Sequence, residues 1–243
     1  MNMELELRGL WKEAFGDTDA FLDLFFSTAY APRRCRSILR SGKPAAALYW
    51  LDCSWQGEKV AYLYAVATAK AFRGQGLCRQ LMEQTLSDLQ QQGYAGAVLV
   101  PGSNTLREMY AKMGFSPLCS RDAFEALPGD PIPLQPLTAA QYALSRREYL
   151  PAGSVLQEEE SLVFLAGQAQ FYRGEDFLLV ALREGDTLVC PELLGNRNAA
   201  AGITAALSCR KGTFHTPGDQ LPFAMWYGLK NCGKPCYFGL AFD

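Results

Sequence analysis

Apolar side chains recur at helical spacing in three stretches of the first 120 residues. The stretch 4–30 is interrupted by the polar turn 16–19 and therefore predicts two short helices. From Leu77 to Leu89 apolar positions return about every 3.6 residues and a glycine follows at 93, which predicts a helix ending near residue 92. A third helix is expected over 105–113.

Between these helices the chain is rich in β-branched and aromatic residues, as strands are. Residues 45–52 and 59–68 predict two strands joined by a hairpin turn at 55–58, and 95–100 predicts a third strand. Five prolines between residues 117 and 137 are typical of a linker. We therefore expect two domains, 1–125 and 126–243.

The second part shows an order of elements similar to that of the first. The expected strands are 161–172, 177–183, 187–194, 213–216 and 237–242, and the expected helices are 198–209 and 223–229. The repeated order suggests a tandem duplication.

The composition is that of an ordinary globular protein, with 49% hydrophobic and 20% charged residues in 243. Neither an apolar run of about 20 residues nor a basic-then-apolar leader occurs, so we expect a cytoplasmic protein that does not enter a membrane. Lysine and arginine are not clustered, which argues against nucleic acid as a partner. The oligomeric state is left open.

Charge and the metal-binding residue types indicate which kinds of ligand to expect. Residues 1–120 carry 13 basic and 11 acidic residues (+2), and the remainder carries 10 and 14 (−4), which favours an anionic ligand in the first half and a cationic one near the second. No Cys-x-x-Cys pair is present, and His215 is the only histidine, so no metal is expected. The eight thiols are predicted to be reduced and mostly buried, and His215 is interpreted as structural.

The most informative segment is 65–82, a strand whose loop holds Gly74 and Gly76 and opens into a helix. Such a loop directs several backbone N–H groups to one place, and the helix N-terminus adds partial positive charge, which suits a phosphate or pyrophosphate. The P-loop pattern is absent. The dinucleotide pattern fails as well, because Arg79 stands where its third glycine is required.

The loop Arg73-Gly-Gln-Gly-Leu-Cys78 resembles the pyrophosphate loop of the GNAT superfamily of acetyltransferases. The likeness continues with Asn104 and with the run Tyr110 to Phe115, and it covers about residues 45–118. The resemblance implies an α/β (α+β) fold with a mixed, mostly antiparallel sheet flanked by helices. With the duplication, two tandem GNAT-like domains are expected.

The resemblance also implies a reaction and residue roles. Acetyl-CoA would donate its acetyl group to a primary amine on a small molecule or peptide. Tyr110 would protonate the departing thiolate, and the pantetheine arm would be held by Val66, Thr68 and Asn104. The pyrophosphate would be held by the backbone of Arg73, Gly74, Gln75, Gly76, Leu77 and Cys78. Cys78 replaces the usual glycine or alanine and is interpreted as a packing residue, not a nucleophile.

Several alternatives stay open at this point. Residues 60–67 lack the carboxylate that many relatives use as the base, so Tyr62, Tyr64, Asp243 and water are the candidates. The second half lacks the second loop glycine after Gly195, so we expect it to have lost the cofactor and to line the acceptor cleft. The competing functions are a non-catalytic acyl-CoA-binding sensor or scaffold and a nucleotide-binding protein.

Overall fold

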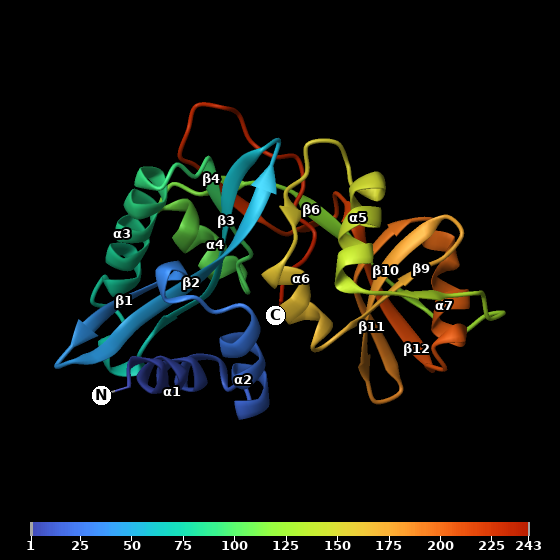
Figure 1. Cartoon of the computed structure of the whole chain (residues 1–243), viewed down its shortest axis with the longest axis horizontal. Helices are drawn as coiled ribbons and strands as arrows, with labels where there is room; N and C mark the ends of the chain where they lie inside the picture. The colour runs from blue at the N-terminus through green and yellow to red at the C-terminus, as the bar shows by residue number, and fades with distance from the viewer. Residues whose placement is uncertain (1, 243) are drawn as a thin grey trace.

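The computed structural model of the chain describes residues 2–242 and has the α+β architecture expected from the sequence. Two mixed sheets, each of seven strands, lie next to each other, one built largely from the first half of the chain and one from the second (Figure 1). The helices cover the outer faces of the sheets and part of the space between them.

The first half begins with two helices whose ends are set by local capping. Asn2 caps the first helix by accepting from the Glu4 N–H, Gly16 ends it in a left-handed conformation, and Thr18 caps the second. The elements are α1 (Met3–Phe15), α2 (Asp19–Thr28), β1 (Cys35–Arg40), β2 (Lys43–Trp55), β3 (Glu58–Thr68), α3 (Leu77–Gln91), β4 (Gly96–Leu99), α4 (Asn104–Ala111), β5 (Ser116–Pro117) and β6 (Ser120–Ala126).

The second half repeats the order of two helices, three strands, a helix and a further strand. Its elements are β7 (Gln135–Leu137), α5 (Ala139–Tyr149), β8 (Leu156–Gln157), α6 (Glu160–Ala166), β9 (Gln170–Arg173), β10 (Phe177–Glu184), β11 (Thr187–Gly195), α7 (Ala200–Ala206), β12 (Lys211–Gly218), β13 (Leu221–Pro222) and β14 (Met225–Gly228). Three short 3-10 turns complete the chain: η1 (Pro32–Arg34), η2 (Lys70–Phe72) and η3 (Arg197–Ala199).

The two sheets exchange strands reciprocally. The first sheet has the order β1-β2-β3-β4-β14-β5, with β8 beside β2, and the second has the order β13-β6-β12-β11-β10-β9-β7. β14, from the end of the chain, pairs antiparallel with β4, while β6, from the first half, pairs antiparallel with β12. Each half therefore completes the sheet of the other.

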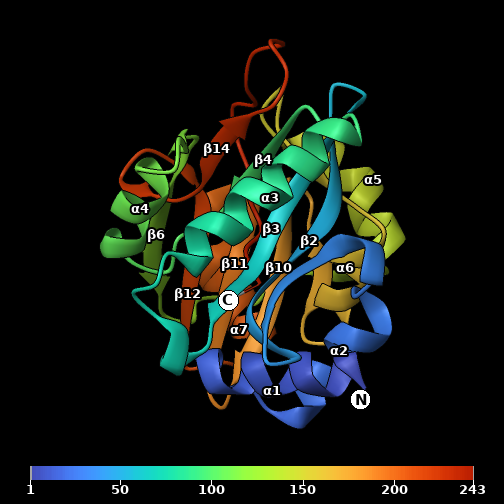
Figure 2. The ribbon, with the colours of Figure 1, turned by 90° about the vertical axis from the view of Figure 1, so that its left-hand side faces the viewer.

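Three apolar clusters hold these layers together. α3 packs on the outer face of the first sheet (Figure 2), and α7 packs on the outer face of the second. Between the sheets lies the largest cluster, in which α1, α2 and α6 contribute Trp11, Phe25 and Phe164 against strands of both sheets. Among the helices formed by residues 2–242, none is long and apolar enough to cross a bilayer.

The structure corrects five sequence predictions. Residues 161–172, expected as one strand, form α6 and then β9, and residues 223–229, expected as a helix, contain strand β14. The expected closing strand 237–242 is not a regular strand, and the expected linker 117–137 contains three strands. All eight cysteines are free, but they are less buried than expected, since only Cys53, Cys190 and Cys209 are fully buried.

Candidate functional site

The turn after β3 has the backbone shape of an anion-binding loop. Gly74 and Gly76 take left-handed φ angles of 75° and 78°. A Cβ atom added to either glycine would meet nothing within 4 Å, so the space beside the turn is open. The Arg73 Nε donates to the Thr68 carbonyl at 3.1 Å and ties the turn to the strand. Glycine takes these angles without strain and leaves the space free for a ligand.

The helix that begins at this turn offers N–H groups without an internal partner. α3 has 15 residues, its N-cap Gly76 makes no side-chain capping bond, and no acidic residue lies in its first turn. The first turn carries Arg79, whose Nη2 donates to the Lys112 carbonyl at 3.5 Å. The helix dipole and the Arg79 guanidinium favour a phosphate or pyrophosphate here. Sequence reasoning had not considered Arg79 as a ligand.

The first sheet opens between β3 and β4 close to this turn. The two parallel strands are paired only from Val60 to Tyr62, opposite residues 96–98 of β4. β3 then carries a bulge against β2 between Tyr64 and Ala67, where Ala65 has a φ of 48°. On the side of β4, the backbone of β3 beyond Tyr62 faces a gap instead of a partner strand. An extended ligand with its own donors and acceptors could pair with β3 in that gap.

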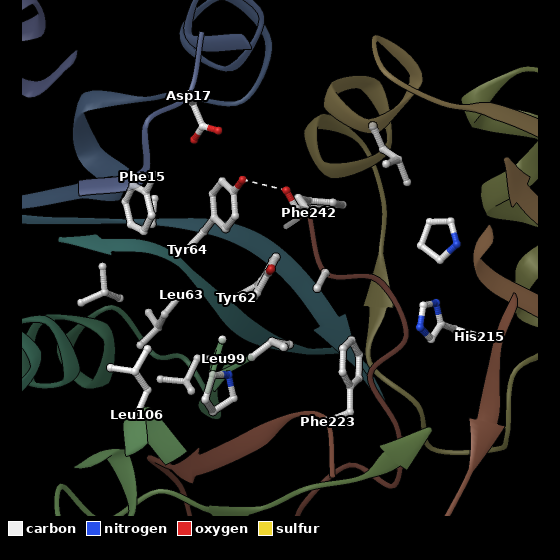
Figure 3. A pocket seen from close by; sticks show the side chains of 18 of the residues that line it. Phe15, Asp17, Tyr62, Leu63, Tyr64, Leu99, Leu106, His215, Phe223 and Phe242 are labelled. Carbon is white, nitrogen blue, oxygen red and sulfur yellow. Dashed lines mark hydrogen bonds between the residues drawn. The ribbon is translucent and has the colours of Figure 1, made fainter. Parts of the chain in front are cut away.

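A cavity of about 890 Å³ extends from this gap to the second half of the chain. Leu63, Val66 and Tyr110 line it on the side of the first half. Pro191 and His215 line it on the side of the second half. Figure 3 shows the side chains of the two halves on opposite sides of the same hollow. The cavity thus lies between the unpaired end of β3 and the inner face of the second sheet.

Tyrosines from the first half form part of the cavity wall. Tyr62 and Tyr64 lie on β3, and the Tyr64 hydroxyl donates to the Phe242 carbonyl at 3.0 Å (Figure 3). Tyr110 lies near the end of α4, is 6% exposed, and packs edge-on against Phe115 with ring centroids 5.9 Å apart. The ring of Tyr110 is therefore held by packing while it borders the cavity.

Three other candidates lie in different surroundings. Asn104 is the exposed first residue of α4 and is not among the described residues that line the cavity, so its contact with the pantetheine arm stays a prediction. Cys78 is half-buried, and burial raises the pKa of its thiol, which makes it a poor nucleophile. Asp243 lies outside the described residues.

The equivalent strands of the second half, β11 and β12, leave no gap between them. β11 carries a bulge against β10 between Val189 and Glu192, as β3 does against β2. However, β11 and β12 stay paired from Thr187 as far as Cys190, at the edge of the bulge. Pro191 stands in this bulge where Val66 stands in β3, and a proline has no N–H to donate. The second half therefore has neither the gap nor the donor.

The turn after β11 is filled from within the protein. The Asn196 side chain accepts from the Asn198 N–H at 3.0 Å and donates to the Asp176 carboxylate at 2.9 Å. A Cβ atom added to Gly195 would lie 2.3 Å from the Asp176 carbonyl oxygen, so this glycine faces protein and not open space. A phosphate at this turn would meet the carboxylate of Asp176, which repels it.

Comparison with known families agrees with this geometry. Residues 4–118 match the sequence profile of a family described as acetyltransferase (GNAT) domain. This segment is a GNAT acetyltransferase domain. Its bounds include the glycine turn and Tyr110, and it ends just before β6, the strand that the first half lends to the second sheet. No curated protein matches the chain at a significant level.

Solved structures extend the likeness to nearly the whole chain. A GCN5-related N-acetyltransferase from Anabaena variabilis is 18% identical, with a TM-score of 0.70 over 94% of this chain and 71% of the other. A GCN5-related N-acetyltransferase from Kribbella flavida is 17% identical, with a TM-score of 0.66 over 93% of this chain and 70% of the other. Eis1 from Mycobacterium abscessus is 13% identical, with a TM-score of 0.64 over 93% and 71%. These likenesses establish the fold of both halves.

Proposed function

We propose that the protein transfers an acetyl group from acetyl-CoA directly to a primary amine. Three neighbouring features carry this proposal: the open glycine turn Arg73–Cys78, the end of β3 that is unpaired with β4 beyond Tyr62, and the cavity lined by Leu63 and Val66. These features offer a site for an anion, then a site for an extended polar chain, and then a cavity. The pyrophosphate, the pantetheine arm and the thioester of acetyl-CoA follow one another in that order.

Each of these features has proposed residues. The backbone N–H groups of Arg73 to Cys78 would hold the pyrophosphate, and the side chain of Arg79 adds positive charge there. Val66 and Thr68 would bond the pantetheine arm on the open side of β3. Asn104 is retained as a further contact to the arm. No metal is required for any of these contacts.

The proposed reaction is a direct displacement in one complex. The lone pair of a neutral amine attacks the thioester carbonyl carbon, the C–N bond forms, and the C–S bond breaks. A strand N–H in the gap would stabilise the negative charge on the carbonyl oxygen. Tyr110 would give its proton to the thiolate, and the proton of the new ammonium would pass to water or to one of Tyr62, Tyr64 and Asp243.

We further propose a division of labour between residues 1–125 and 126–243. The first part is the catalytic domain that binds acetyl-CoA. The second part is a degenerate GNAT-like domain that lines the acceptor cleft, because its strands are closed and its turn is filled. This division rests on the site and not on separate sheets, since β6 and β14 cross between the halves.

Release of free thiol from acetyl-CoA tests the proposed function. We expect release with at least one member of a panel of aliphatic amines, arylalkyl amines, amino acids, peptides and polyamines. A sensor or scaffold would bind acetyl-CoA without releasing thiol in the presence of any amine. A nucleotide-binding protein would bind ATP or NAD in competition with CoA.

A Tyr110→Phe variant should bind acetyl-CoA with unchanged affinity and turn over about 10²-fold more slowly, because a general acid contributes at least that factor. Turnover is read from the thiol assay at saturating acetyl-CoA, and affinity is read by calorimetry. Tyr227→Phe is the matched control, since Tyr227 also packs on Phe115, with ring centroids 5.4 Å apart, but does not line the cavity. Equal turnover of the two variants would remove Tyr110 from the mechanism.

Calorimetric titration of the full chain with CoA should give one site per chain. The second half lacks the open gap, and its turn is occupied by the side chains of Asn196 and Asp176. A stoichiometry of two would show that the second half still binds the cofactor and that its proposed role is wrong.

A further inference from the structure

The second sheet presents its inner face to the cavity through side chains of β6, β10, β11 and β12. Leu182 of β10, Val189 and Pro191 of β11, and His215 of β12 all line the cavity. Their neighbours Leu188, Cys190 and Phe214 point the other way, into the cluster beneath α7. Because side chains alternate along a strand, this face is set by the register of the sheet. It lies across the cavity from the tyrosines of β3 (Figure 3).

His215 is the unusual member of this face. Its Nδ1 is buried and has no hydrogen-bond partner among the residues that the structure describes. Burial and the neighbouring Arg121 guanidinium lower the pKa of the imidazole from its ordinary value, against a smaller opposing effect of a hydrogen bond with the Cys190 backbone, and so favour the neutral ring. The hydrogen bond to the Cys190 backbone favours the protonated ring and therefore uses a ring N–H. Since Nδ1 has no partner among the described residues, this N–H is assigned to Nε2, and Nδ1 of the neutral ring is the lone-pair acceptor. Buried polar atoms in folded proteins almost always have a partner, and a ligand in the cavity can supply one here.

The rest of the lining is largely apolar. Of the 27 described residues around the cavity, five carry charged or amide and imidazole side chains: Asp17, Arg121, Gln168, Glu184 and His215. Apolar side chains continue to the solvent, since Phe15 is 48% exposed and Leu106 is 38% exposed. An apolar lining with few polar groups binds a molecule that is itself mostly apolar.

The charge of the second half is not concentrated at this face. Among the described residues after 120, Glu184 is the only carboxylate that lines the cavity, and Arg121 is a cation. Asp17, from the first half, already accepts from the Trp11 indole N–H at 2.7 Å. The expectation that the charge of −4 favours a cationic ligand near the second half therefore finds no support in the described lining.

We infer that His215, with Leu182, Val189 and Pro191, forms the acceptor subsite, and that the acceptor is a primary amine on an apolar, aromatic body that carries a hydrogen-bond donor. This inference rests on the proposed acetyl transfer. The donor bonds the imidazole of His215, the apolar body contacts the face of the second sheet, and the amine points towards the thioester between β3 and β4. His215 is a specificity-determining residue and takes no part in the transfer of the proton.

Three amines test the features of this acceptor one at a time: tyramine, phenethylamine and spermidine. Tyramine and phenethylamine differ by one hydroxyl donor, whereas spermidine is a polycation without an apolar body. With the full chain and saturating acetyl-CoA, we expect kcat/KM to fall in that order. Tyramine should exceed phenethylamine by about tenfold or more, because a site built around a hydrogen bond rejects the analogue that lacks it.

Two variants of His215 test the residue itself. In His215→Phe, kcat/KM for tyramine should fall to that for phenethylamine. The value for phenethylamine should stay within about twofold of its wild-type value. His215→Asn, whose side-chain oxygen can stand near the place of Nδ1, should restore part of the preference. A structural role alone would lower both rates together and leave their ratio unchanged.

The outcomes distinguish this inference from the function on which it rests. A rate highest with spermidine, equal wild-type rates for the two arylalkyl amines, or a ratio that is unchanged in His215→Phe would overturn the subsite while leaving acetyl transfer intact. Binding of acetyl-CoA by calorimetry without thiol release for any amine would overturn acetyl transfer, and the inference with it.

Discussion

A Gly76→Val chain that is folded but binds CoA at least 100-fold more weakly is the largest effect we expect. Gly76 has a φ of 78°, and a β-branched residue rarely takes that angle. The valine side chain would also enter the open space beside the turn, where the pyrophosphate is proposed to lie. Strain and occlusion therefore act together. Calorimetry with CoA measures the affinity, and circular dichroism measures the fold.

The matched control is Gly57→Val. Gly57 has a φ of 82° and also has nothing within 4 Å of an added Cβ, but it lies in the hairpin turn at the opposite end of β3. The control introduces the same kind of backbone strain without entering the proposed site, so it should bind CoA like the wild type. Wild-type affinity in folded Gly76→Val would exclude the turn as the pyrophosphate site. Equal losses in both variants would attribute the effect to strain.

An Arg146→Met chain should lose about 3–5 kcal/mol of unfolding free energy, because one partner of a buried ion pair is removed. Arg146 is 1% exposed and Glu192 is fully buried, and they form two hydrogen bonds of 2.6 and 2.8 Å. Burial alone would lower the pKa of Arg146, but the Glu192 carboxylate raises it above its ordinary value. Tyr142 also donates to Glu192, at 2.7 Å. Without the guanidinium, this carboxylate is left in the core without its counter-charge.

Urea denaturation followed by fluorescence measures the loss. Arg210→Met is the control, because Arg210 pairs with Asp186 at 3.2 Å while both side chains are largely exposed, and such surface pairs contribute at most about 1 kcal/mol. A second variant, Arg146→Met with Glu192→Leu, should recover much of the stability, since it leaves no unpaired charge. If the single and double variants were equally unstable, the loss would come from packing and not from the buried charge.

The parts of the fold that could be predicted are those with local signals. The β2–β3 hairpin has its turn residues at 55–58, and α3 has a helical period bounded by glycines. By contrast, Glu160–Ala166 contains a short apolar run whose period does not separate a strand from a buried helix. β14 could not be identified because its partners β4 and β5 lie more than 100 residues earlier. Long-range pairing decides whether such a segment forms a strand.

In the candidate site, too, some parts follow from the local sequence and others depend on long-range pairing. The glycine turn is a contiguous motif, and its left-handed angles follow from the residues themselves. The position of His215 depends on the register between β12 and β6, which joins residues about 90 apart and leaves no trace in the local sequence. The closure of the second half depends likewise on how far β11 and β12 stay paired. Interpreting His215 as a structural residue was reasonable from sequence, but it does not explain a buried Nδ1 that has no partner among residues 2–242.

The exchange of β6 and β14 has a consequence for folding during synthesis on the ribosome. Proteins usually fold from the N-terminus as they are made, one domain after another. Here β4 cannot pair with β14 at once, because β14 is synthesised more than 120 residues later. The first sheet therefore stays incomplete until almost the entire chain has emerged. Until then β4 has an open edge, which is a template for wrong pairing with other chains. We therefore expect that premature termination releases a chain prone to aggregation, even though the glycine turn and the tyrosines of β3 have already been made.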